Sequence, residues 1–145
     1  MNPYSELVTD LAAHLAASGV GEWSETGAYP KGTIMPIYVG IIHDKADTGI
    51  GLQVYSDDRS RDDASPDIRV QVRVRGDQNP LPTGIGPTTA DRIFTLLHDK
   101  QHLTLNNHTI VLLSRRHLRA PEERDDTGRW TRADSYTFTT NPGGS

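Results

Sequence analysis

The stretch of sequence that decides the fold is Ile68-Arg69-Val70-Gln71-Val72-Arg73-Val74-Arg75. Aliphatic and polar side chains alternate along it, and successive side chains of a β-strand point to opposite faces. The alternation therefore predicts an amphipathic strand over 68–75, with its aliphatic face against the core. Turn-forming residues bound this strand, since Pro66-Asp67 precedes it and Gly76-Asp77 follows it.

The polar face of the predicted strand is unusual because it carries Arg69, Arg73 and Arg75. One interpretation is a solvated outer face of the sheet. The other is a contact surface, because arginine is enriched at interfaces and its planar guanidinium binds carboxylates through two hydrogen bonds.

The composition bounds the class of protein. A chain of 145 residues, 34% hydrophobic and 23% charged, is expected to fold as one domain over residues 1–145. The net charge of −4 argues against a general nucleic-acid-binding protein. There is no cysteine, so no disulfide or thiol chemistry is expected. The sequence predicts neither a membrane-spanning segment nor a signal peptide.

Charge is distributed unevenly along the chain. Residues 1–56 contain two lysines and six acidic residues, whereas residues 67–145 contain eleven basic and nine acidic residues. One interpretation is that the acidic half of one subunit pairs with the mildly basic half of another. The other is that the asymmetry arises by chance.

Two helices are predicted from apolar residues at helical spacing. The first stripe consists of Leu7, Val8, Leu11 and Leu15. The second stripe consists of Ala90, Ile93, Phe94, Leu96 and Leu97. Gly19 is a natural C-terminal cap for the first helix. The second helix is expected to begin at Thr88 or Thr89 and to end near His102.

Four further strands are predicted, at 34–42, 52–55, 109–114 and 130–140. The first of these is apolar on both faces, so it is expected to be central in the sheet or covered by a helix. Loops are expected at 56–65, 77–87 and 115–129, and a frayed tail at 141–145. The predicted fold class is α+β, a mixed or mainly antiparallel sheet of about five strands packed against two helices.

Candidates for metal binding are weak. His98 and His102 lie four residues apart on the second predicted helix, a spacing that suits one metal ion, but the glutamate of the metalloprotease pattern is absent. The acidic set Asp57, Asp58, Asp62 and Asp63 lacks the alternating ligands and the glycine of a calcium loop. We therefore expect no metal site and no cofactor.

A metal-dependent DNA-processing enzyme is the leading enzymatic alternative. Pro66-Asp67 ahead of a strand suits one class of nuclease, but Gln71 and Arg73 stand where an acid and a lysine are needed. The glycine-rich segment 84–88 lacks the Gly-Lys-Ser/Thr of a phosphate-binding loop, and no serine lies in a nucleophile elbow. We expect no catalytic residues and a protein that is not an enzyme.

Taken in order along the chain, these stretches resemble the tail terminator or minor capsid proteins of long-tailed bacteriophages. They are the helix Leu7–Leu15, Gly19-Val20-Gly21, Trp23, Val54-Tyr55, the run from Val70 to Gly76, Pro80, the helix Ala90–Leu97 with His98, Arg115-Arg116, Gly128-Arg129, Tyr136 and Phe138. The resemblance covers nearly the whole chain and rests on the ensemble.

This resemblance implies a structural virion protein, made in the host cytoplasm, that forms a ring at the head-proximal end of the tail tube. Such a ring is typically a hexamer; it stops tube polymerisation and joins the tail to the head connector. Genomic DNA would pass through it without specific binding. The alternative within the virion is a head-side connector, neck or minor capsid protein.

Contacts with a neighbouring subunit or a partner are expected from arginine side chains. The expected contact residues are Arg69, Arg73, Arg75, Arg115, Arg116 and Arg129.

Overall fold

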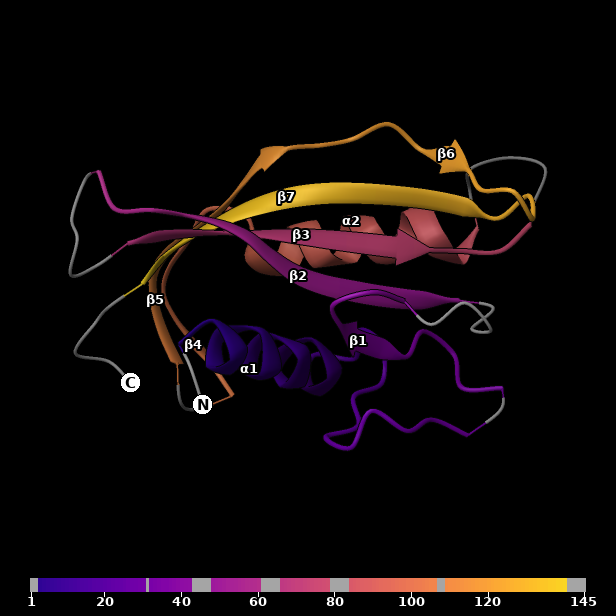
Figure 1. Ribbon diagram of the computed structural model, residues 1–145, viewed down its shortest axis with the longest axis horizontal. Coiled ribbons are helices and arrows are strands. Elements are labelled where there is room, and N and C mark those ends of the chain that lie inside the picture. The colour runs from indigo at the N-terminus through magenta and orange to yellow at the C-terminus, as the bar shows by residue number, and fades with distance from the viewer. Residues whose placement is uncertain are drawn as a thin grey trace.

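The strand predicted at 68–75 is β3 (Asp67–Arg75), and it lies in the middle of a curled sheet (Figure 1). The computed structural model describes residues 3–30, 32–42, 48–60, 66–78, 84–106 and 109–140. The other elements are α1 (Pro3–Ala17), β1 (Ile37–Val39), β2 (Gly49–Asp58), α2 (Ile85–Leu97), β4 (Lys100–Leu105), β5 (Thr109–Leu118), β6 (Glu123–Arg124) and β7 (Trp130–Thr140). The fold is α+β, as the sequence predicts.

The sheet has the order β1-β2-β3-β7-β5-β4, with β6 paired to β7 beyond the end of β5. All pairs are antiparallel except β1 with β2. In the centre, Val72 lies opposite Leu52 of β2 and Asp134 of β7. The sheet is therefore mixed and mostly antiparallel.

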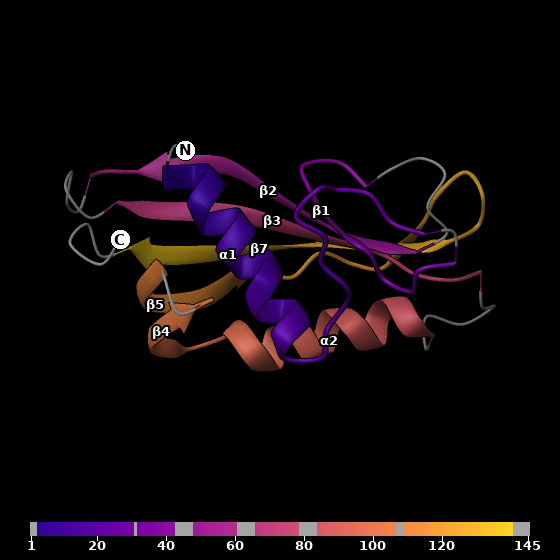
Figure 2. The same cartoon turned by 90° about the horizontal axis from the view of Figure 1, so that it is seen from below.

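Both helices cover the same face of the sheet (Figure 2). Helix α1 contacts β1, β2, β4 and β5, because the sheet curls around it, while α2 contacts β3, β5 and β7. The core between the layers contains the predicted stripes of both helices and the aliphatic face of β3. Its most buried large side chains include Leu7, Leu11, Leu15, Ile50, Leu52, Ile93, Leu97, Tyr136 and Phe138.

Helix α1 ends as the sequence predicts. Gly19 has a φ of +82°, a left-handed conformation that glycine adopts without steric cost. The N–H of Val20 donates to the carbonyl oxygen of Leu15 at 2.9 Å, which satisfies one of the last helical carbonyls.

Helix α2 differs from the prediction at both ends. It begins at Ile85 after Gly84, so neither Thr88 nor Thr89 is its N-cap. Pro87 fits the first turn because the N–H groups there have no helical partner. The helix ends at Leu97, and residues predicted as its last turn form β4, a strand that the sequence analysis missed.

The strand predicted at 34–42 is shorter and lies elsewhere in the sheet. Only Ile37–Val39 forms β1, which is an edge strand and not a central one, although α1 covers its inner side. Pro36 lacks a backbone N–H and Gly40 has a φ of +100°, so the strand is interrupted on both sides. The apolar residues around it are therefore not all buried.

Three predicted loops are shorter than expected. Strand β2 continues to Asp58 and β5 to Leu118, and β6 lies within the predicted 115–129 connection. The last strand, 130–140, coincides with β7. Residues 61–65 of the first loop, 79–83 of the second, and the tail 141–145 lie outside the described residues.

Candidate interaction surfaces

The face of the sheet opposite the helices, which we call the outer face, carries the three arginines of β3. Arg69 lies 3.6 Å from a carboxylate oxygen of Asp58, and Arg75 lies 3.9 Å from one of Asp125. Arg73 is exposed, and it has no ion-pair partner among the residues that the structure describes. Arg73 therefore keeps its full set of guanidinium donors for a group outside the subunit.

A hydrogen-bonded bridge crosses the outer face from β2 to β5. His117 Nε2 lies 3.0 Å from the hydroxyl of Tyr55, and its Nδ1 lies 2.9 Å from the hydroxyl of Thr137. Partial burial, together with the positive charge of Arg69, lowers the pKa of His117 below its ordinary value. The bridge is therefore built on a neutral imidazole at neutral pH.

One end of the outer face is covered by the chain itself. Ile42 is buried and lies directly over Gly49 and Gly51 of β2, where a Cβ on either glycine would be 3.0–3.1 Å from its side chain. The close approach favours glycine at both positions, because Ile42 would have to move to admit a Cβ. With Ile42 turned inward, the neighbouring Ile41 is left 81% exposed.

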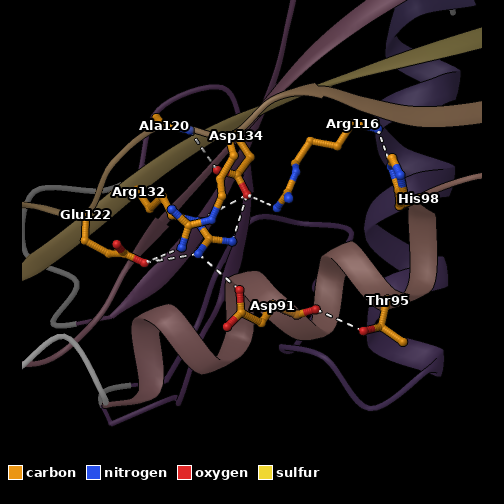
Figure 3. Close-up of polar contacts among 9 residues, drawn as sticks. Asp91, Thr95, His98, Arg116, Ala120, Glu122, Arg132 and Asp134 are labelled. Atoms are coloured by element: carbon orange, nitrogen blue, oxygen red, sulfur yellow. Dashed lines mark hydrogen bonds and ion pairs between the residues drawn. The ribbon is translucent and has the colours of Figure 1, made fainter.

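On the helix side of β7, buried charges form an ion-pair cluster (Figure 3). The Nη2 of Arg132 lies 2.9 Å from Asp134, and its Nη1 lies 3.1 Å from both Asp91 and Glu122. Burial alone would lower the pKa of Arg132. The hydrogen bonds that Arg132 donates to Asp134, together with the negative charge of that carboxylate, outweigh burial, so the pKa is raised. The cluster joins α2, β7 and the β5–β6 connection.

Arg116 belongs to this cluster and not to the outer face. Its guanidinium lies 3.4 Å from Asp134 and 3.9 Å from the ring centroid of Phe94, and the side chain is 17% exposed. Its backbone N–H donates to Nδ1 of His98 at 3.2 Å. Arg116 is therefore occupied within the subunit.

The remaining arginines expected at contacts lie apart from one another. Arg115 is 61% exposed on β5 and lies 3.4 Å from Asp99. Arg129 follows a turn in which Oδ1 of Asp125 accepts hydrogen bonds from the backbone N–H groups of Thr127 and Arg129. The structure thus brings the three β3 arginines together. Arg115 lies on the same face, because it pairs with Thr137, which in turn pairs with Arg69. Asp125 contacts both Arg75 and the backbone of Arg129, whereas Arg116 points to the helix side.

Exposed apolar side chains are the surface feature that the sequence analysis missed. Among the described residues, the exposed large apolar side chains are Ile34, Val39, Ile41, Tyr55, Leu113 and Leu118. The sequence signal was present in the 34–42 run, whose two apolar faces we interpreted as burial. A hollow of about 320 Å³ lies beside β1, and its lining includes Trp23, Tyr38, Ile41 and Glu25.

The described residues contain no cluster of three or more histidine or acidic side chains arranged to hold a metal ion. His98 lies just after α2 and His102 lies on β4, so the two do not share a helix. Of the acidic set considered for calcium, Asp62 and Asp63 lie outside the described residues. No helix in the described part of the chain is long and apolar enough to span a membrane.

Comparison with known proteins decides between the structural and the enzymatic interpretation. No curated protein matches the chain. A family model described as "Bacteriophage tail terminator protein" matches residues 14–142, from within α1 to beyond β7. The family is structural, so the DNA-processing alternative is wrong. The chain belongs to the bacteriophage tail terminator family, whose members are non-enzymatic structural proteins of the virion tail.

Proposed function

We propose that the protein forms a closed ring at the head-proximal end of the tail tube, where it stops tube polymerisation and joins the tail to the head. Membership of the tail terminator family supports association with the tube and oligomerisation. The proposal adds six copies per ring, a contact with the head connector, and passage of genomic DNA without specific binding. The protein is made in the host cytoplasm before it joins the virion.

The observation that carries the contact assignment is the free guanidinium of Arg73 on the outer face. Its neighbours Arg69 and Arg75 lie near Asp58 and Asp125 of the same subunit, whereas the described residues place no such carboxylate beside the exposed Arg73. An arginine in this setting fits a carboxylate presented by a neighbouring subunit or by the end of the tube.

Each such contact is weak by itself. An exposed ion pair contributes about 0–1 kcal/mol, and copies of it add together around a ring. The contact should weaken with salt, because the Debye length falls from about 10 Å at 0.1 M to about 3 Å at 1 M. Higher salt should therefore detach the protein from tails more readily.

Tail length separates a terminator from a head-side connector. Tails assembled without the protein should have uncontrolled lengths, because nothing stops tube growth, and adding the purified protein should restore a narrow length distribution. Tails of normal length that merely fail to join heads would assign the protein to the connector instead. Electron microscopy of negatively stained tails measures both properties.

The role of Arg73 is tested by Arg73→Glu with Arg73→Lys as its matched control. Reversing the charge should reduce the fraction of tails that carry the protein by about tenfold, while Arg73→Lys, which keeps the charge, should lose much less. Equal capping by wild type and Arg73→Glu would show that the outer face is only a solvated surface.

A further inference from the structure

Two of the places where apolar side chains of the described residues are exposed lie on different strands of the sheet. The first is the hollow beside β1, which we call the β1 hollow, with Trp23, Tyr38, Val39 and Ile41 among its lining residues. The second lies on β5, where Leu118 is 56% exposed at the end of the strand. We call Leu118 and the adjoining Arg119 the β5 tip.

The β1 hollow combines apolar walls with an acidic rim. Ile41 is 81% exposed and Val39 46% exposed, so this apolar surface faces water in the isolated subunit. Glu25 lies in the lining, and Glu22 precedes it on the segment that bridges to Pro36. Neither acid has an ion-pair partner among the described residues. A volume of about 320 Å³ is ample for one aliphatic side chain.

The β5 tip has the opposite charge. Leu118 is followed by Arg119, which is 45% exposed and lies 3.0 Å from Glu122. Glu122 also forms an ion pair with the buried Arg132. Its carboxylate is therefore shared between Arg132 and the exposed Arg119. Arg115, 61% exposed, adds a second cation on the same strand. The β5 tip, an apolar side chain beside cations, is therefore complementary to the β1 hollow, which is apolar beside acidic side chains.

The two regions lie on opposite sides of the subunit. Strand β1 is at one end of the sheet, and β2, β3 and β7 separate it from β5, which is about 19 Å measured along the curled sheet at 4.7–4.9 Å per strand. In Figure 1, β1 lies below β2, whereas the chain leaving β5 runs along the upper border towards β6. The two regions therefore cannot meet within one subunit. Unlike, complementary surfaces on opposite sides are what a head-to-tail contact requires.

We propose that each subunit inserts Leu118 of its β5 tip into the β1 hollow of the next copy, where Arg119 pairs with Glu25. The inference rests on the ring proposed above and specifies its subunit interface. Burial of Ile41, Val39 and Leu118 stabilises the contact through the hydrophobic effect, which has no directional preference. The ion pair between Arg119 and Glu25 fixes the orientation of the two subunits. The occupant of the hollow is a second copy of this chain.

Cysteine cross-linking tests the contact cleanly because the chain contains no cysteine. The double variant Ile41→Cys with Leu118→Cys, bound to purified tails and oxidised, should give a ladder of covalent oligomers up to the complete ring. Either single variant should stay at the monomer mass. The pair Ile41→Cys with Thr95→Cys is the matched control, and it should give no ladder, since Thr95 is exposed on α2 and lies outside the proposed interface.

Charge reversal tests the polar half of the same interface. Glu25→Arg and Arg119→Glu should each reduce capping of tails at least tenfold, because each places like charges together. The two changes in one chain restore the pair at every interface, so capping should return to within about threefold of wild type. Glu25 is exposed and makes no ion pair among the described residues, so the unfolding curve of Glu25→Arg should match that of wild type. Arg119→Glu loses the pair with Glu122 and should lower the free energy of unfolding by about 1 kcal/mol or less, so the double variant tests whether capping returns without that stability.

The outcomes separate this inference from the proposed function. If wild type restores tail length but the double cysteine variant gives no ladder on those tails, the interface is wrong and the terminating ring stands. A cross-link from Leu118→Cys to another tail protein would likewise overturn it by assigning the β5 tip to a different partner. If wild type fails to restore tail length, the proposed function itself fails.

Discussion

The side chains of Arg132 and Asp134 form an ion pair with two hydrogen bonds, almost completely shielded from water. The Nη2 and Nε of Arg132 lie 2.9 Å and 3.2 Å from the same oxygen of Asp134, and the two side chains are 2% and 4% exposed. Since they are two residues apart on β7, both point to the helix side of the sheet. They place charge in a layer that is mainly apolar.

Removing one partner of this pair should be strongly destabilising. Asp134→Ala leaves Arg132 buried without its main carboxylate, so we expect the free energy of unfolding to fall by about 3–5 kcal/mol. Asp91→Ala is the control, because Asp91 binds the same guanidinium but is 67% exposed, and its loss should cost about 1 kcal/mol or less. Urea denaturation measures both. Equal losses of unfolding free energy in the two variants would show that the buried pair contributes no more than the exposed one.

The hydroxyl of Tyr136 is buried, and it has no hydrogen-bond partner in the described structure. Burial raises the pKa of this phenol, with the charge of Asp134 adding to the effect. Because Tyr136→Phe removes a polar atom that makes no hydrogen bond, the free energy of unfolding should stay the same or rise. Tyr136→Ala, by contrast, should lower it by about 3–5 kcal/mol through loss of the ring. A clear loss of stability in Tyr136→Phe would reveal a partner for the hydroxyl.

Gly76 and Gly86 hold the end of β3 against the first turn of α2. A Cβ built on Gly76 would lie 2.6 Å from Cα and 2.7 Å from N of Gly86, which are backbone atoms that cannot rotate away. Gly76→Ala should therefore lower the free energy of unfolding by about 1–3 kcal/mol. Gly27→Asn is a suitable control, because that site is open and asparagine tolerates its φ of +74°. Thermal unfolding measures both variants. A higher midpoint for Gly76→Ala than for Gly27→Asn would contradict the steric argument.

His117 should titrate below the ordinary value for histidine, since burial and Arg69 both lower its pKa. Arg69→Gln removes the second cause and should move the pKa upward, which NMR titration of the imidazole signals can follow. Because the folded-state pKa is below the unfolded one, the contribution of His117 to stability is complete above about pH 6.5 and is lost as the pH falls through the folded value. A pKa above the ordinary value would contradict the hydrogen-bonded bridge to Tyr55 and Thr137.

The sequence by itself determined the elements whose side chains repeat with a clear period. The alternation in 68–75 fixed β3 and its buried face, and the apolar stripes located both helices. The ensemble of stretches also indicated the tail terminator family. These are local properties, because the direction of a side chain in a strand or helix follows from its position along the same element.

Only the tertiary structure decided which apolar and charged side chains are buried. The 34–42 run contains two apolar faces, but its strand is at the edge of the sheet, so Ile41 faces water. Arg116 is an arginine like Arg115 in the sequence, but it is largely covered because β5 turns it towards Phe94 and Asp134. Burial depends on which elements pack on a strand, and these come from distant parts of the chain that local periodicity does not specify.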